Sequence, residues 1–418
     1  MVTKIIKEKV FIILILIPSY LYDASLFNAN TFIKEYGVTI VISIISLWSI
    51  APQFIKGYKV EIGISIIDLL FVLLVGINVI IFKENALVKG LMIVYYSLLY
   101  ASTRIILNEV KLEHIKKFLA NFTAAILFIH IFIVVLQKFD VVHLFYGSLK
   151  NGSTFGNPDM LASYLAILFP FVFLGNKRFI KYLSTIILVG FFVIVQARTA
   201  LLAVVLCGFC SLLLNKRISR NIIVLILGVG TIFLSLLIYW QPVSVLGRFF
   251  VWYISILMII QKPFGWGAFA FEKHYPEFQA NFLSEHVIPN YITPDIVHSP
   301  FNEFLNIGVT LGVFGLLLYS SIIVVAFYYT IKAKSILVYP IIVFFVVSFS
   351  FFPLSIAPLM VVIIPMLAVV SMNSKYYIKL RFNMYVKNSL ISLIIVVFLL
   401  LGMQSIKLYT SSKYMTKI

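Results

Sequence analysis

Charged residues are scarce in this sequence of 418 residues: Asp, Glu, Lys and Arg make up 11% of it, whereas 62% is hydrophobic. Several apolar runs are long enough to cross a hydrocarbon core of about 30 Å as helices of about 20 residues. The alternating segments of about 10 residues that are typical of membrane β-barrels are missing. The sequence therefore predicts an all-α, polytopic transmembrane helical bundle, with residues 1–418 forming a single integral membrane domain.

Cysteine is nearly absent. Cys207 and Cys210 are the only two, in the motif CGFC inside an apolar run. A lone CxxC in a membrane helix is a weak signal of chemistry, so both are expected to be small apolar core residues. The first apolar run also lacks a small-residue cleavage site, and we interpret it as a retained first helix rather than a signal peptide.

Acidic residues are few as well: 15 Asp and Glu stand against 33 Lys and Arg, for a net charge of +18. Alternating the spans across the membrane puts 21 of the 33 Lys and Arg on the side of the N-terminus, which the positive-inside rule makes cytoplasmic. The basic excess thus indicates topology, with membrane lipids and no nucleic acid as partners. The predicted spans are residues 10–26, 37–55, 61–82, 87–107, 118–137, 159–175, 179–196, 199–214, 221–240, 304–329, 336–352, 355–372 and 388–406.

One connection is long: residues 241–303, on the outer side, and loops of this length are usually functional. Its stretch FVWYISILMII is apolar but too short to span comfortably. We expect a helix at the outer membrane surface, with Arg248 near its start and Trp252, a candidate substrate contact, within it. An isolated interfacial arginine can simply reach the lipid headgroups, and that alternative stays open.

A second arginine, Arg198 in QARTALLAV, stands between two apolar spans with almost no room for a loop. An ionisable residue there is costly unless it has a partner, so it is interpreted as functional. Arg198 and Arg248 are then both expected at the outer face. Two guanidinium groups offer bidentate donors to phosphate oxygens, and a pyrophosphate carried on a lipid would suit the pair.

A histidine stands just before the next span, in HSPFNEF, where Asn302 and Glu303 follow His298. Histidine titrates near neutral pH and can act as a general base toward an attacking hydroxyl. A lone loop histidine is more often structural or solvated. The polar neighbours and the immediate entry into the membrane favour a site role for His298, with Asn302 and Glu303 near the substrate.

Four further features have mainly structural interpretations. In PFGWG the glycines allow a tight turn and Trp266 offers a face for a sugar, although an interfacial anchor is as good an explanation. Asp159, after GN and Pro158, suits a helix cap or dipole partner, with a role in shaping the outer cavity as the alternative. Gly308, Gly312 and Gly315 fit close helix packing. Asp68 is a buried acid whose sharper interpretation is a proton pathway.

Together these motifs resemble the superfamily of O-antigen ligases and O-antigen polymerases, which are glycosyltransferases of the bacterial envelope. The resemblance covers about residues 150–372. It rests on GNPDMLA, QARTALL, GRFFVWYISILMIIQKPFGWG and HSPFNEFLNIGVTLGVFG, of which the last two, in that order on one loop, are fairly specific. It implies a GT-C-like bundle of about a dozen spans. Our count of thirteen leaves the short basic tail 407–418 outside, against the charge rule, so twelve and thirteen spans both stay open.

The resemblance further implies a metal-independent, cofactor-free and inverting transfer of a glycan from undecaprenyl diphosphate to an acceptor hydroxyl, on the outer side of the bacterial inner membrane. In this sequence Arg198 and Arg248 would hold the diphosphate and His298 would assist the attack. The acceptor could be lipid A core, a growing polysaccharide or a protein. The alternative function is a transporter or flippase for lipid-linked glycans, which would place polar groups near the membrane midplane rather than at one face.

Overall fold

The computed structural model describes residues 2–23, 32–55, 61–81, 86–107, 113–142, 151–214, 242–286, 297–372 and 378–381, with Met403, Ile406 and Thr410 near the C-terminus. The predicted span 221–240 lies outside the described residues. The predicted span 388–406 and the predicted tail 407–418 lie outside them except for those last three residues.

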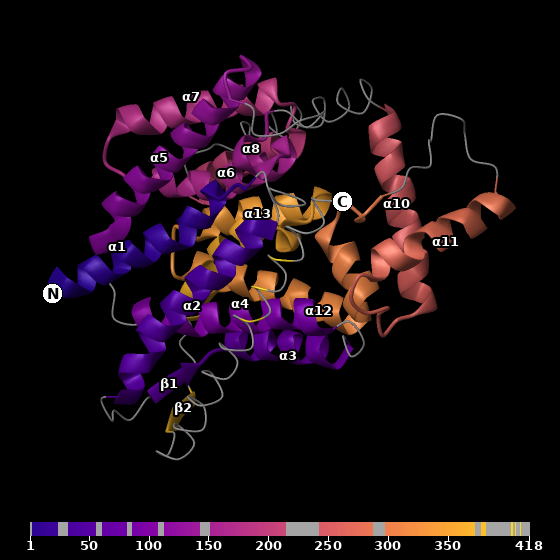
Figure 1. Ribbon diagram of the computed structural model, residues 1–418, viewed down its shortest axis with the longest axis horizontal. Helices are drawn as coiled ribbons and strands as arrows, with labels where there is room; N and C mark the ends of the chain where they lie inside the picture. The colour runs from indigo at the N-terminus through magenta and orange to yellow at the C-terminus, as the bar shows by residue number, and fades with distance from the viewer. Residues whose placement is uncertain are drawn as a thin grey trace.

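The regular structure of the described residues is helical except for one two-stranded ribbon, and the helices stack into a bundle (Figure 1). Each predicted span that the described residues cover overlaps a helix, which agrees with the expected all-α membrane class. The helices are α1 Val2–Leu16, α2 Phe32–Ile55, α3 Ile66–Ile81, α4 Ala86–Leu107, α5 Glu113–Lys138, α6 Pro158–Val172, α7 Arg178–Ile194, α8 Arg198–Leu214, α10 Pro242–Gln261, α11 Ala270–Glu285, α12 Glu303–Lys332, α13 Val338–Ser350 and α14 Ala357–Met372, with short 3₁₀ turns η1 Ile17–Tyr20, η2 Ser153–Phe155 and η3 Pro353–Ser355.

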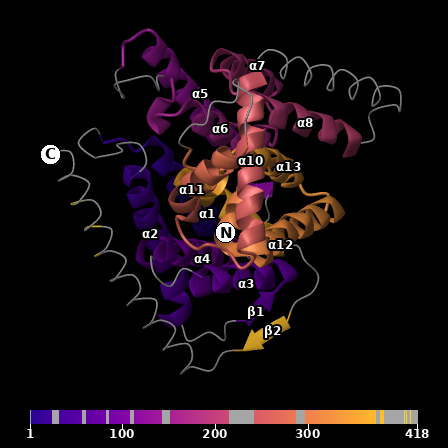
Figure 2. The same cartoon turned by 90° about the vertical axis from the view of Figure 1, so that its right-hand side faces the viewer.

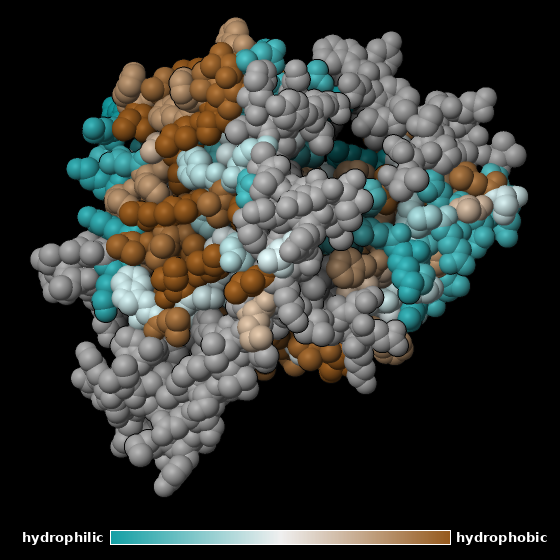
Figure 3. All heavy atoms as spheres, in the orientation of Figure 1, coloured by the Kyte–Doolittle hydropathy of each residue, from teal (hydrophilic) through white to brown (hydrophobic). Residues whose placement is uncertain are grey.

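Two helical stretches, Ile115–Lys138 and Glu303–Lys332, are long and apolar enough to cross a membrane by length and composition, and seven shorter helices are apolar. Large apolar side chains also lie on the outside of the molecule, as in α7, where Phe179 and Ile186 are 74% and 70% exposed. Figure 3 shows this hydrophobic surface around α5 and α7 and a hydrophilic surface over α11. Exposed apolar surface of this extent indicates a face that meets lipid. The number of spans stays a prediction.

The long outer loop of the sequence contains two helices, α10 and α11. Helix α10 starts at Pro242, a residue favoured in the first helical turn, and runs for 20 residues. It therefore begins well before the stretch FVWYISILMII. Helix α10 lies against α12 and α11 (Figure 2).

Helix α12 is not straight. Gly312 has φ 71° and ψ −169°, a backbone conformation outside the helical region. Phe304 and Tyr319 would lie about 22 Å apart along a straight helix, but their ring centroids are only 5.2 Å apart. The chain therefore reverses at Gly312, and residues 303–311 fold back along residues 313–332. The predicted span 304–329 is in this respect wrong, because only its second part runs on as one straight helix.

The turn PFGWG fills this break with main-chain hydrogen bonds. Trp266 N donates to Val309 O (2.9 Å), Gly267 N to Thr310 O (3.0 Å), and Val313 N to Pro263 O (2.8 Å). These bonds satisfy groups that the interrupted helix leaves unpaired. A Cβ on Gly265 would stand 2.5 Å from Thr310 O, and one on Gly312 would collide with Pro263 O. The expectation that Gly312 serves close packing between helix surfaces is thus corrected: here two backbones meet.

The ribbon joins two segments that lie far apart in the sequence. Strand β1 (Glu61–Ile64) pairs antiparallel with β2 (Ile378–Arg381), with Glu61 opposite Arg381. Sequence reasoning expected residues 61–64 to open the third span, and the structure shows that this helix starts after the strand. The main-chain partner strand, more than 300 residues away, determines the extended conformation.

Asp68 has partners at the start of α3. Its carboxylate accepts from Ser65 N (2.6 Å) and from the Tyr100 hydroxyl (2.5 Å), and forms an ion pair with Arg104. Arg104 also donates to Gly63 O in β1 (2.8 Å). These contacts give the buried acid a structural role, connecting α3, α4 and the ribbon, and no proton pathway is needed to account for it.

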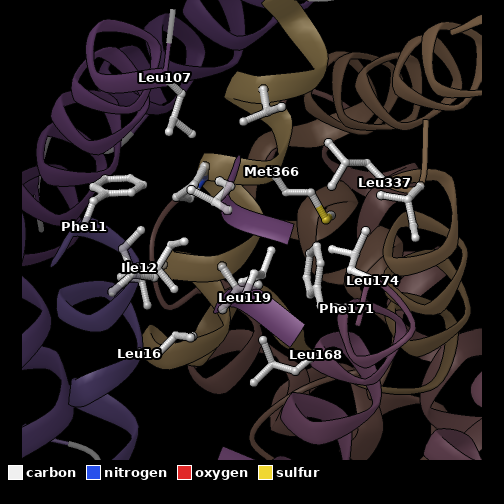
Figure 4. A pocket seen from close by; sticks show the side chains of 17 residues that line it. Phe11, Ile12, Leu16, Leu107, Leu119, Leu168, Phe171, Leu174, Leu337 and Met366 are labelled. Carbon is white, nitrogen blue, oxygen red and sulfur yellow. The ribbon is translucent and has the colours of Figure 1, made fainter. Parts of the chain in front are cut away.

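An apolar cavity of about 110 Å³ lies between α1, α5, α6 and α14. Figure 4 shows Phe11 and Ile12 of α1, Phe171 of α6 and Met366 of α14 around it. The cavity is separate from the polar residues singled out in the sequence. Cys207, with the half-buried Cys210 one turn further along α8, belongs to the same apolar interior, and both thiols are free. The expected core role of the two cysteines agrees with this.

Candidate active site

Arg198 is the first residue of α8. Helix α7 ends at Ile194, and the turn between the two helices, residues 195–197, is short because Gln196 adopts a positive φ of 57°. A helix N-terminus carries partial positive charge, so a cation there gains nothing from the dipole. The position of Arg198, half-buried at a tight turn, therefore needs another explanation.

Arg248 comes to the same place from α10. Its Nη1 donates to Ser350 O at the end of α13 (3.3 Å), and the Ser350 hydroxyl donates to Thr199 Oγ1 (3.1 Å), next to Arg198. Burial and the charge of Arg198 both disfavour the charged form of the Arg248 guanidinium, while Asp159 favours it. The structure thus brings together the two arginines that lie 50 residues apart in the sequence. Like charges held together repel, and an anion between them would relieve this.

Helix α10 also holds the segment that carries His298. The Arg248 guanidinium lies over the Phe301 ring, 5.5 Å from its centroid, and the Trp252 indole Nε1 donates to Pro300 O (2.9 Å). The side chain of Trp252, predicted to contact substrate, therefore fastens the backbone just after His298. His298 itself is exposed, and its imidazole makes no hydrogen bond within the described part of the chain. Its role as a base stays a prediction.

Asn302 and Glu303 fix the same segment from inside. Asn302 is the N-cap of α12, accepting from Leu305 N (3.2 Å). Glu303 is 1% exposed, and its two oxygens accept from Asn306 Nδ2 (3.0 Å) and Leu354 N (2.9 Å). The hydrogen bonds of both side chains thus stabilise the start of α12 and the 353–355 turn. Their predicted contact with substrate stays a prediction.

Replacing Glu303 by glutamine should destabilise the protein. The substitution keeps the size but turns one acceptor oxygen into an NH₂ group, which leaves a buried N–H donor unpaired at a cost of about 1–3 kcal/mol. We expect a lower melting temperature in detergent. Glu272→Gln is the matched control, because Glu272 lies in the exposed first turn of α11. Equal melting temperatures for Glu303→Gln and wild type would contradict this account of the buried carboxylate.

Trp266 lies away from the arginines, at the far end of α10. Its Nε1 donates to Met258 O (2.8 Å), the Lys262 ammonium lies 5.0 Å from its ring centroid, and the His274 ring lies 4.6 Å away. Burial and the neighbouring Lys273 lower the pKa of His274, so this imidazole is kept neutral more readily than a free one. The Trp266 ring already has protein partners where a sugar was predicted to stack.

Sequence reasoning gave Asp159 a different role. The side chain of Asn157, not Asp159, caps α6, with Oδ1 accepting from Asp159 N (2.8 Å) and Met160 N (3.3 Å). Of the two predicted roles, the cap is wrong, while the role of dipole partner agrees with the place of Asp159 in the first turn of α6. Its carboxylate instead lies in the electrostatic field of both Arg248 and Arg198. Ser350 was also missed, because its contribution is a main-chain carbonyl that no residue type announces.

The described residues contain no group of three or more His, Cys, Asp or Glu side chains placed to hold a metal ion. What they do offer is positive charge beside an exposed histidine, with a groove beside Trp252. Such an arrangement can bind an anionic leaving group by fixed donors.

Comparison with known families now bears on this arrangement. A family model described as O-antigen ligase matches residues 183–320, from within α7 to the second arm of α12. Over these residues the chain is similar to the O-antigen ligase family. The matched residues of this O-antigen ligase region include Arg198, Arg248, Trp252, Trp266 and the segment 298–303. The family implies a membrane glycosyltransferase of the ligase or polymerase type, acting on lipid-linked glycans. No curated protein matches the chain.

Proposed function

We propose that this protein transfers a glycan from undecaprenyl diphosphate to an acceptor hydroxyl at the outer face of the bacterial inner membrane. The observation that carries the proposal is the convergence of Arg198 and Arg248, from two different helices, beside the His298 segment. Each guanidinium presents a planar set of donors that matches phosphate oxygens. Together they would hold the diphosphate of the donor.

A groove beside the site supports a donor with a lipid tail. The groove has a volume of about 580 Å³ and runs from Trp252 and Asn302 between α10, α12 and α13. Its lining is mostly apolar and aromatic, which suits an isoprenoid chain whose diphosphate end lies at the arginines. The main apolar residues along it are Ile256, Phe304, Leu305, Ile323, Val324, Phe327, Phe345 and Phe349.

The reaction follows from these positions. The acceptor oxygen attacks the anomeric carbon, its proton passes to the imidazole of His298, and the bond between that carbon and the diphosphate oxygen breaks. Negative charge grows on the departing diphosphate, where the two fixed guanidinium groups stabilise it without a metal ion. Attack from the side opposite the leaving group inverts the anomeric centre. The acceptor classes are lipid A core, a second lipid-linked glycan and a protein hydroxyl.

The test is glycan transfer by the purified protein in detergent, with a glycan on undecaprenyl diphosphate and each acceptor class in turn. His298→Ala is expected to lower the rate by roughly a hundredfold, within the range for loss of a general base. His286→Ala is the matched control, because His286 is an exposed histidine of the same loop. EDTA is expected to leave the rate unchanged.

Three results would contradict the proposal in different ways. Full activity of His298→Ala would remove the base from the mechanism, and a loss of activity in EDTA would remove its metal independence. Absence of transfer by the wild type to every acceptor, combined with movement of the donor across liposome membranes, would favour a flippase instead. The acceptor that gains sugar identifies the subclass.

A further inference from the structure

We propose that Asp159 is an anionic third member of the arginine site, and that it weakens the hold of Arg198 and Arg248 on a diphosphate so that the lipid diphosphate product can leave. This inference rests on the proposed function. It adds a residue of the opposite charge, outside the region matched to the O-antigen ligase family, to the two arginines.

The fold gives Asp159 its place. It is the second residue of α6, a helix that begins with Pro158 and is capped by Asn157. Helix α6 packs against α8, which starts with Arg198, and against α13, which ends at the serine that binds Arg248. Because Asn157 satisfies the first N–H groups, the Asp159 carboxylate is not needed for the cap, and its side chain is exposed.

Buried contacts hold the segment before α6 in place. Gln137 of α5 binds both main-chain groups of Ser153, accepting from its N–H (2.8 Å) and donating to its carbonyl (3.2 Å). The Lys34 ammonium, 3% exposed, donates to Thr154 O and to Leu21 O. The position of Asp159 is thus set by the backbone that precedes it, and not by an ion pair of its own.

The carboxylate acts on the arginines through space. Neighbouring protein atoms partly desolvate the carboxylate, which disfavours its charged form, while Arg248 and Arg198 favour it. Asp159 in turn favours the charged form of Arg248. In the described part of the chain, no other side chain forms an ion pair or a hydrogen bond with the carboxylate. A diphosphate held by the two arginines would therefore also be repelled by the Asp159 carboxylate.

The charge of the site then decides how tightly it binds. Loss of the Asp159 carboxylate would make the charge around a bound diphosphate more positive by one unit. The donor and the spent lipid carrier present the same diphosphate, so extra attraction strengthens binding of both and does not speed the chemical step. A carboxylate at the rim lowers that attraction, which favours release of the spent carrier.

Binding of inorganic pyrophosphate to the full-length protein in detergent tests this. Asp159→Asn removes the charge with little change of shape and is expected to bind pyrophosphate about tenfold more tightly than wild type. The gain should shrink as salt rises, since salt screens charges across a site open to water. In the transfer assay pyrophosphate should inhibit Asp159→Asn at correspondingly lower concentration.

Two variants control for other causes. Glu272→Gln also turns a first-turn acid of a helix into an amide, away from the arginines, and should bind pyrophosphate like wild type. Asp159→Glu retains the charge and should bind pyrophosphate with nearly wild-type affinity. If Asp159→Glu is as stable as wild type and only Asp159→Asn binds more tightly, the lost charge and not the altered side chain is the cause.

The results also separate this proposal from the proposed function. Unchanged or weaker binding by Asp159→Asn overturns it, and weaker binding would mean that Asp159 holds the arginines in position. Binding by wild type that is equally strong in Arg248→Ala would overturn the diphosphate site itself. Arginine-dependent binding that ignores Asp159 would leave the proposed function standing and remove this inference alone.

Discussion

Replacing either arginine of the site by alanine is expected to lower glycan transfer by roughly a hundredfold or more, the effect of losing one fixed donor at a developing negative charge. Arg198 is the first residue of α8 and Arg248 is the seventh residue of α10, and the two helices are linked there through Ser350 and Thr199. Removing one guanidinium leaves the other without its partner on the diphosphate. The rate should fall more than the affinity for the donor, because charge on the leaving group is greatest in the transition state.

The measurement is the initial rate of transfer by purified variants at saturating and limiting donor. Arg178→Ala is the matched control for Arg198→Ala, since each arginine is the first residue of an apolar helix, and Arg178 is exposed. Arg248→Lys separates charge from geometry, because lysine keeps the charge but lacks the planar pair of donors. Near-normal transfer by both alanine variants would show that the leaving group is stabilised elsewhere.

Gly312→Ala is expected to be the most damaging substitution outside the charged site. The backbone of Gly312 lies in a region of φ and ψ that is essentially restricted to glycine, and holding another residue there costs about 1–3 kcal/mol. The added methyl group would also collide with Pro263 O, a main-chain atom that three neighbouring hydrogen bonds hold in place. We expect a sharp drop in melting temperature and in transfer, because residues 303–311 would lose their main-chain hydrogen bonds to the turn PFGWG.

Gly208→Ala provides the comparison. Gly208 lies within α8, with nothing inside 4 Å of an added Cβ, so alanine there should leave stability unchanged or raise it by up to about 1 kcal/mol. Thermal unfolding of both variants in the same detergent measures the difference. A Gly312→Ala protein as stable as Gly208→Ala would mean that α12 can run straight, and the reversal would then be wrong.

The helices could be predicted from the sequence because apolar runs between turn residues determine them almost alone. The reversal of α12 could not. Gly308, Gly312 and Gly315 look alike in a hydropathy profile, and only the approach of Pro263 and Gly265 identifies which glycine turns the chain. That approach depends on tertiary structure, which the order of residues does not reveal.

The candidate site could be predicted from the sequence only in part. Arg198 and Arg248 were conspicuous as charges beside apolar runs, so chemistry alone suggested that they meet. Asp159 had an adequate local explanation as a helix cap, which concealed its electrostatic interaction with both arginines. Asn302 and Glu303 were predicted as substrate contacts because they are polar. In the structure their side chains accept hydrogen bonds from main-chain N–H groups at the start of α12 and at Leu354.

The ribbon of β1 and β2 imposes an order of events during synthesis. Strand β1 leaves the ribosome more than 300 residues before its partner, Ile378–Arg381, exists. At usual elongation rates this delay is roughly 15–60 s. Helix α3 packs against α12, and α4 packs against α14. Both early helices must therefore stay in the membrane without these packing partners until the later helices are made. A nascent chain stopped before residue 378 would carry β1 without its partner strand.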